Sequence, residues 1–200
     1  MKKLAIGLFL ILGLSVFAEG SKIEVRGGYD FGAKYDVDDI WDGGDAKAGT
    51  FEIGTEYRYE VSPGLEVGGG IAYQSHKKIK NGYEAYNSVP VYLTTKYTFD
   101  TGSVKPYLKA DLGYSFNKSK KLTGTDIDKK HNTTDDFSGK LKFKNGLYAS
   151  VGVGLEYRNF VTELAYVHTT AKIKWDDDEF GNERYNNNAL RLTVGYKFNF

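Results

Sequence analysis

The last twelve residues of the chain alternate strictly between apolar side chains and polar or small ones. Leu190 begins the apolar set, which recurs at every second residue and ends at Phe200. The intervening set includes Arg191 and Lys197. Successive side chains of a β-strand point to opposite faces, so this segment predicts a strand with one wholly apolar face. A membrane-spanning β-barrel, with hydrocarbon outside and a polar lumen inside, requires such strands.

The amino-terminal segment predicts an exported protein. Two lysines form a basic start, and residues 4–14 are almost continuously apolar. Val16 and Ala18 place modest side chains at the two positions that a signal peptidase reads. The apolar run is too short to cross a bilayer. We therefore interpret residues 1–18 as a cleaved signal peptide, rather than a retained membrane helix, and residues 19–200 as one barrel domain.

Composition limits the possible folds and functions. The absence of cysteine excludes disulfides and cysteine-based metal sites. The formal net charge of +1 does not suggest a nucleic-acid binder. After the signal, no stretch is apolar and long enough for a transmembrane helix. A chain that enters a membrane without such a helix has to form a closed β-barrel, because every backbone N–H and C=O group must be paired within the sheet.

Period-two alternation recurs along the chain together with many β-branched and aromatic residues, and it predicts eight strands. These strands cover residues 22–35, 48–61, 65–76, 86–99, 104–116, 146–157, 160–175 and 189–200.

The phase of the alternation assigns the two faces of each strand. In the first strand it places Phe31 and Ala33 outward and Lys34 inward. The seventh strand is the least regular, and an inward Glu163 requires His168 to face outward. Each apolar face is expected to contact lipid, and each polar face is expected to line the lumen.

Short and long connections alternate between the predicted strands. Tight turns are expected at residues 62–64, 100–103 and 158–159, and long polar loops at residues 36–47, 77–85, 117–145 and 176–188. This asymmetry is typical of outer-membrane barrels, in which the short turns are periplasmic. The predicted fold is all-β, a transmembrane eight-stranded antiparallel up-and-down β-barrel with both termini on the periplasmic side.

Aromatic residues support the same layout, because they gather near both ends of the predicted strands. Tyr57 and Tyr97 fall near the turns, whereas Tyr73, Tyr114 and Phe116 fall near the loops. Amphipathic rings favour the membrane–water boundary, so two aromatic girdles are expected.

The carboxyl-terminal pattern is also that of an assembly signal. A polar residue, a glycine and two aromatics occupy Thr193, Gly195, Phe198 and Phe200. This pattern resembles the signal by which the barrel-assembly machinery recognises its substrates. With the eight-strand layout, residues 19–200 resemble the small OmpA/OmpX-type family of outer-membrane β-barrels. The resemblance implies a monomer in the bacterial outer membrane, surrounded by lipid and lipopolysaccharide.

Charged residues gather on the predicted inward faces. An eight-stranded barrel is narrow enough for side chains to fill its interior. Buried charges are costly unless they are paired, so we expect a cross-strand ion-pair network. Its candidate members are Glu52, Glu56, Arg58, Lys96, Lys109, Asp111, Glu163 and Arg191. We favour a hydrated or plugged lumen that carries no solute, and a narrow channel for small solutes is the alternative.

The predicted loops carry opposite charges. Loops 36–47 and 176–188 are acidic, and loop 117–145 is rich in lysine. Carboxylates are ligands for hard divalent cations, so the acidic loops suggest a cation site. The spacing departs from an EF-hand, because Phe180 occupies a ligand position. Solvated loop charge is therefore the favoured interpretation, and we predict no metal and no cofactor.

Catalysis is not expected. Outer-membrane barrels that remodel lipid A use a histidine with a nearby hydroxyl and a carboxylate. His168 is followed by Thr169 and Thr170, but a serine at the required offset and an orienting acid are missing. We expect a structural and surface-interaction protein, adhesion-like, acting through its extracellular loops, chiefly 117–145. A host protein, lipopolysaccharide and another outer-membrane protein remain equally open as ligands.

Overall fold

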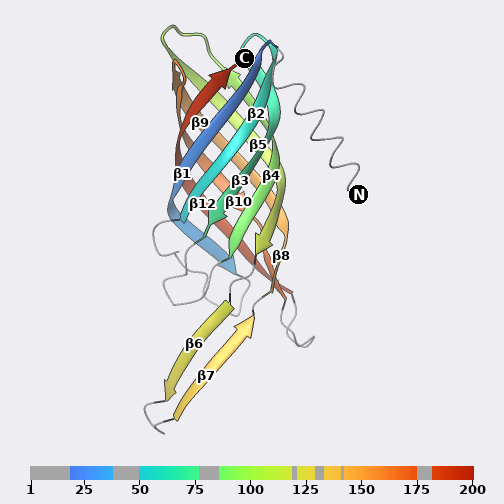
Figure 1. Ribbon diagram of the computed structural model, residues 1–200, viewed down its shortest axis with the longest axis vertical. Coiled ribbons are helices and arrows are strands. Elements are labelled where there is room, and N and C mark those ends of the chain that lie inside the picture. Colours follow the sequence, from blue (N-terminus) through green and yellow to red (C-terminus); the bar gives the residue numbers. More distant parts are fainter. Residues whose placement is uncertain are drawn as a thin grey trace.

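The computed structural model describes residues 19–37, 50–76, 86–118, 121–128, 133–140, 142–174 and 182–200. Eight long antiparallel strands, each paired with the next along the chain, form a barrel (Figure 1). These strands are β1 (Ser21–Val37), β2 (Thr50–Ser62), β3 (Leu65–Ser75), β4 (Asn87–Thr98), β5 (Val104–Lys118), β9 (Gly146–Tyr157), β10 (Phe160–Thr169) and β12 (Asn182–Asn199).

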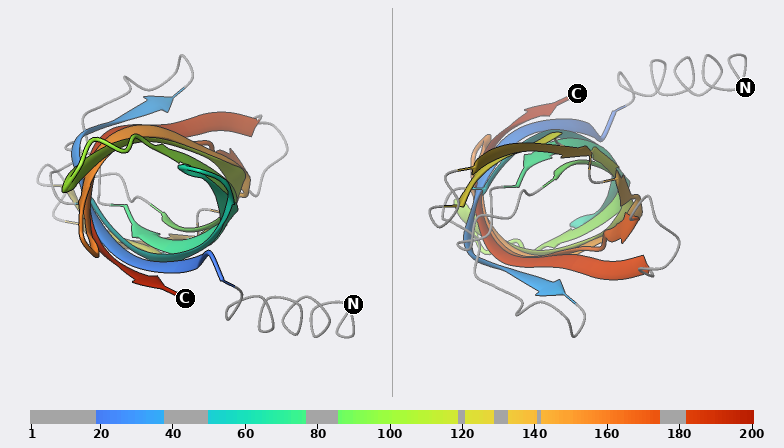
Figure 2. Two further views of the ribbon diagram at one scale, coloured as in Figure 1. Left: turned by 90° about the horizontal axis from the view of Figure 1, so that it is seen from above. Right: turned by 90° about the horizontal axis from the view of Figure 1, so that it is seen from below.

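Pairing between β1 and β12 closes the sheet, and the views along the barrel show the resulting ring (Figure 2). The predicted eight-stranded fold is confirmed. Three tight turns lie at the end where the carboxyl terminus also lies, which we call the turn end (Figure 1). The strand ends that the long connections join lie at the opposite end, which we call the loop end. No helix in the described part of the chain could span a membrane.

The loop end carries additional β-structure that the sequence pattern did not predict. Strands β6 (Lys121–Asp128) and β7 (Thr133–Lys140) form a hairpin of their own, which projects beyond the barrel (Figure 1). Short strands β8 (Lys142–Lys144) and β11 (Lys172–Lys174) extend the sheet next to β12. The third connection is therefore largely a β-hairpin rather than an irregular loop.

The barrel reverses the usual distribution of polar and apolar side chains. Large apolar residues cover its outside, and Leu93 is 75% exposed. In β10, the strand with the least regular alternation, Leu164 faces outward whereas Val161 and Val167 are buried. The predicted phase of this strand is correct, but the strand ends at Thr169 instead of reaching residue 175.

The phase of β1 changes near its loop end, which corrects the prediction for this segment. Phe31 pairs with Leu190, but Lys34 pairs with Asn188, so β1 gains one residue against β12. Gly32 adopts a positive φ of 56°, a conformation that glycine permits at a β-bulge. The side chain of Ala33, predicted to face outward, is buried, and that of Lys34, predicted to face inward, is exposed.

Several predictions lie outside the described residues. The proposed signal peptide, residues 1–18, is one of them, and so are residues 38–47 and 176–181 of the two acidic loops. Residues 182–188, predicted as loop, belong to β12 instead. The cation hypothesis therefore stays untested. Among the described residues, no group of three metal-ligating side chains is assembled.

Candidate functional site

The lumen is the candidate functional site, because charged side chains fill it along most of its length. All eight ion-pair candidates predicted from the sequence line this interior. The buried carboxylates are Glu24, Asp30, Glu52, Glu56, Glu66, Asp111, Glu156 and Glu163, and the buried cations are Arg26, Arg58, Lys96, Lys109, Arg191 and Lys197.

Glu56 on β2 is the centre of the network. Its carboxylate lies 2.7 Å from Arg26 Nη1 and 2.7 Å from Lys109 Nζ, and it also pairs with Arg58. The Tyr92 hydroxyl donates a further hydrogen bond to Glu56 at 2.9 Å. Strands β1, β2, β4 and β5 thus meet at one carboxylate. Four donors offset the cost of burying its charge, since a buried charge is tolerated when it is paired and hydrogen-bonded.

Arg26 and Lys109 extend the network to the rest of the ring. Arg26 Nη2 lies 2.7 Å from Glu163 Oε1 on β10. Lys109 Nζ donates to Asp111 Oδ2 at 2.9 Å, and Ser150 Oγ on β9 donates to the same oxygen at 2.6 Å. Arg26 therefore connects carboxylates on β2 and β10, and Lys109 connects carboxylates on β2 and β5.

A second centre lies toward the loop end. Arg191 on β12 holds Asp30 in a bidentate pair, with distances of 2.5 Å from Nε and 3.0 Å from Nη2. Its remaining nitrogen, Nη1, pairs with Glu52, which also accepts a hydrogen bond from Gln74 at 2.8 Å. This fork geometry fixes β12 against β1 and β2.

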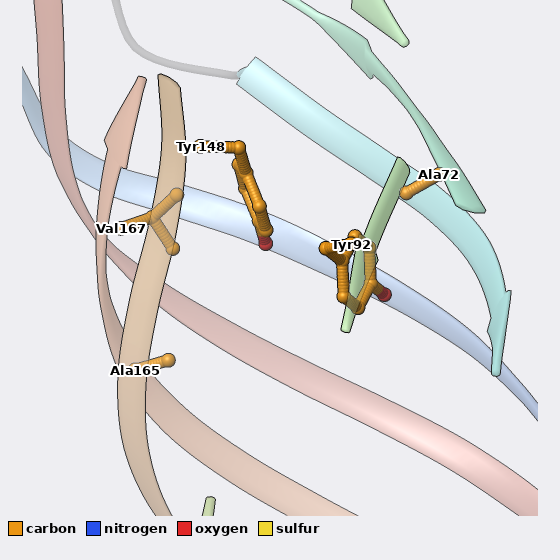
Figure 3. Packing of buried hydrophobic residues seen from close by; sticks show 5 residues of the cluster. All are labelled: Ala72, Tyr92, Tyr148, Ala165 and Val167. Carbon is orange, nitrogen blue, oxygen red and sulfur yellow. The ribbon is translucent and has the colours of Figure 1, made fainter. Parts of the chain in front are cut away.

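Two tyrosines and three small or branched apolar residues pack inside the barrel. The cluster contains Ala72, Tyr92, Tyr148, Ala165 and Val167, with the two rings pointing into the space between the strands (Figure 3). The ring centroids of Tyr92 and Tyr148 lie 5.1 Å apart. Aromatic and ionic side chains together occupy the middle of the lumen.

Two tyrosine rings pack over glycines on neighbouring strands, a feature that was not predicted from the sequence. Tyr92 stands directly opposite Gly70, and Tyr107 stands opposite Gly154. A Cβ atom added at Gly70 would lie 2.5 Å from the Tyr92 ring, and one at Gly154 would lie 2.2 Å from the Tyr107 ring. The signal is a glycine paired with a tyrosine, but it becomes visible only once the strand register is known.

The turn end of the lumen opens into a cavity of about 660 Å³. Two ion pairs lie in its wall. Lys22 Nζ lies 2.6 Å from Glu66 Oε1, and Lys197 Nζ lies 2.7 Å from Glu156 Oε2. At the rim, Lys105 hydrogen-bonds to Asp100 and thereby lowers the pKa of that carboxyl group. The cavity is lined by both signs of charge.

A buried histidine–serine pair near the loop end was also missed. His76 Nε2 lies 2.9 Å from Ser88 Oγ, and both residues are buried. Ser88 donates its hydroxyl hydrogen to Asn117 Oδ1 at 3.0 Å. The Ser88 hydroxyl hydrogen is thus directed at Asn117 and not at the imidazole.

The predicted assembly residues lie on both faces of β12. Thr193 faces the lumen, where its hydroxyl oxygen accepts a hydrogen bond from Arg26 at 3.3 Å. Gly195 is also on the inner face, whereas Phe198 and Phe200 are exposed on the outside at the turn end. Recognition of these residues by an assembly machinery stays a prediction.

A closed eight-stranded barrel with an apolar outside and a charged lumen defines a class, the small β-barrel membrane protein. Residues 4–198 match the family model of the outer membrane protein beta-barrel domain, and the chain belongs to this family. Membership places the protein in the bacterial outer membrane and confirms the predicted family.

Individual proteins are also similar to this chain. An uncharacterized protein of Pasteurella multocida is 30% identical over 238 residues, covering 99% of this chain and 98% of that protein. Neisserial surface protein A is 16% identical, with a TM-score of 0.51 over 90% of this chain and 98% of that structure. The outer membrane protein OprG of Pseudomonas aeruginosa is 15% identical, with a TM-score of 0.51 and coverages of 91% and 97%. At these identities the two structures show the shared fold alone.

Proposed function

We propose that this protein is a structural and surface-interaction barrel of the outer membrane, adhesion-like, that carries no solute and performs no catalysis. The observation that carries the proposal is the filled lumen. A passing solute would have to separate the buried pairs around Glu56 and Arg191 and leave charges unpaired in a sheltered interior. Breaking a buried pair is strongly unfavourable, so the network favours a closed plug.

The loop end supplies the surface for interaction in this proposal. Hairpin β6–β7 projects from a rigid scaffold, and binding residues are disproportionately found on such segments. The short turns and the carboxyl terminus share the other end of the barrel, which supports a periplasmic turn end and an extracellular loop end. A host protein, lipopolysaccharide and a second outer-membrane protein are the ligand classes to screen.

The absence of catalysis is likewise part of the proposal. His168 Nδ1 lies 2.6 Å from Asn188 Oδ1, an amide oxygen rather than a carboxylate. Expression of the protein should leave the lipid A species of the host cell unchanged by mass spectrometry. A new, deacylated lipid A species that disappears in the His168→Gln variant would contradict this part of the proposal.

The decisive experiment measures solute flux and single-channel conductance of the refolded protein in bilayers, with heat-modifiable gel mobility as proof of folding. Folded protein without conductance is the expected result. The cavity of about 660 Å³ at the turn end favours the second candidate, a narrow channel. Reproducible conductance that changes in Arg191→Gln or Glu56→Gln would establish the channel and reject the closed lumen.

A further inference from the structure

Three polar side chains form a row across adjacent strands on the outside of the barrel. Asn188 on β12 stands opposite Lys34 on β1, and it also stands opposite His168 on β10. The His168 imidazole hydrogen-bonds through Nδ1 to Asn188 Oδ1 at 2.6 Å. The Tyr166 hydroxyl donates to the same oxygen at 3.0 Å. The amide thus fixes the imidazole in place on the outer face.

The outward direction of this row follows from the pairing. Asn188 is two residues from Leu190, which is 50% exposed, so both side chains lie on the outer face of β12. Directly paired residues share a face, which places Lys34 and His168 outside as well. The bulge at Gly32 is responsible, because an unbroken alternation along β1 would have pointed Lys34 into the lumen. Bulges re-aim side chains in this way.

The row lies where the apolar surface of the barrel ends. Toward the loop end, Leu190 is the last apolar residue on the outer face of β12, and Asn188 is the next residue on that face. Phe31 and Tyr166 are exposed beside Leu190. Aromatic rings at this level mark the membrane–water boundary. A lysine there keeps its charged end at the level of the lipid headgroups. No carboxylate in the described part of the chain forms an ion pair with Lys34.

We propose that Lys34, Asn188 and His168 form a binding site for the phosphate group of a membrane lipid. The Lys34 ammonium group offers a phosphate charge, and the Asn188 NH2 group offers directed hydrogen bonds. The His168 imidazole, whose Nδ1–H is donated to Asn188 Oδ1, positions this amide. The apolar rings and Leu190 lie beside the row, where the acyl chains of the same lipid would lie. The proposed function places the loop end on the outer side of the membrane, and the identity of the lipid rests on this orientation. The ligand is then a phosphorylated glycolipid of the outer leaflet.

The test titrates the refolded full barrel in detergent micelles with bisphosphorylated lipid A, with dephosphorylated lipid A and with inorganic phosphate. Native mass spectrometry measures the lipid retained on the protein. We expect phosphorylated lipid A to bind about tenfold more tightly than its dephosphorylated form, and Lys34→Gln to remove that preference. Lys118→Gln, a matched exposed lysine on the opposite wall, should bind as the unchanged protein does.

A second measurement reports on the site independently of affinity. In protein with isotope-labelled histidine, phosphorylated lipid A should shift the His168 ring signals and leave those of buried His76 unchanged. Equal binding by Lys34→Gln and unchanged protein would overturn the site, and inorganic phosphate that displaces the lipid at equal concentration would reject a lipid ligand. The micelle experiment does not depend on the leaflet, so its failure is distinguishable from a wrong orientation in the cell.

Discussion

At the scale of single residues, the interior is a polar core in which each buried charge is stabilised by its ion-pair and hydrogen-bond partners. Glu56 is tolerated because Arg26, Arg58, Lys109 and Tyr92 all turn toward it. The same dependence makes the network vulnerable, since removing the Glu56 carboxylate takes one buried ion-pair partner from each of three cations.

Glu56→Gln should therefore lower the free energy of unfolding by about 3–5 kcal/mol, the usual cost of breaking a buried ion pair. Reversible urea unfolding in phospholipid vesicles measures this loss. Glu60→Gln is the matched control, because the side chain of Glu60 is 36% exposed at the rim and its pair with Lys22 should contribute less than about 1 kcal/mol. Equal losses in both variants would show that Glu56 is not the centre of the network.

The tyrosine–glycine pairs lead to a second residue-scale prediction. Gly154→Ala places a Cβ atom 2.2 Å from the Tyr107 ring and 2.3 Å from the Thr162 carbonyl oxygen. Overpacking of this kind costs about 1–3 kcal/mol, which urea unfolding should detect. Gly27→Ala is the control, since the nearest atom to its added Cβ lies 3.9 Å away. A neutral Gly154→Ala variant would contradict the close packing described for Tyr107.

At the scale of elements, the alternation of each strand places apolar side chains toward lipid and polar ones toward the lumen. The free-energy cost of a charged residue on the lipid-facing side depends on its depth in the bilayer. Leu93→Arg in the middle of β4 should destabilise the barrel by about 2–4 kcal/mol in vesicles, whereas Val61→Arg near the end of β2 should cost no more than about 1 kcal/mol. Similar costs at both positions would argue against the placement of the strands across the bilayer.

Hairpin β6–β7 is an element that the barrel does not need for closure. Its strands pair with each other in a separate two-stranded sheet. Deletion of residues 121–140 should leave heat-modifiable mobility intact and abolish binding in a screen of host proteins and lipopolysaccharide. Loss of the folded band in gels would instead show that the hairpin supports the barrel, and full binding would move the interaction to other loops.

At the scale of the whole molecule, the two ends of the barrel should face different compartments. The cysteine-free sequence allows single reporters without background labelling. On intact cells, a membrane-impermeant maleimide should label Lys118→Cys at the loop end, and should reach Ser103→Cys at the turn end only after the outer membrane is permeabilised. The reverse labelling pattern would invert the proposed orientation.

The amino-acid sequence by itself determined the eight strands, the phase of most of them and the charged character of the lumen. Alternation is a local property, so it needs no knowledge of neighbours. The phase of β10 was assigned correctly from Glu163, although its end was not, and all eight charged candidates face the interior. The bulge at Gly32 was not predicted, because an inserted residue is recognised only when the register of β1 against β12 is known.

Only the tertiary structure decided which charges meet. Arg26 reaches Glu163, which lies 137 residues away in the chain, because closure of β1 on β12 brings β10 to the same side of the lumen. Closure of β1 on β12 also places Lys34 beside Asn188 and His168, and the bulge directs the Lys34 side chain to the outside of the barrel. A sequence states which side chains carry charge, whereas their partners depend on strand register and ring closure, which are properties of the assembled sheet.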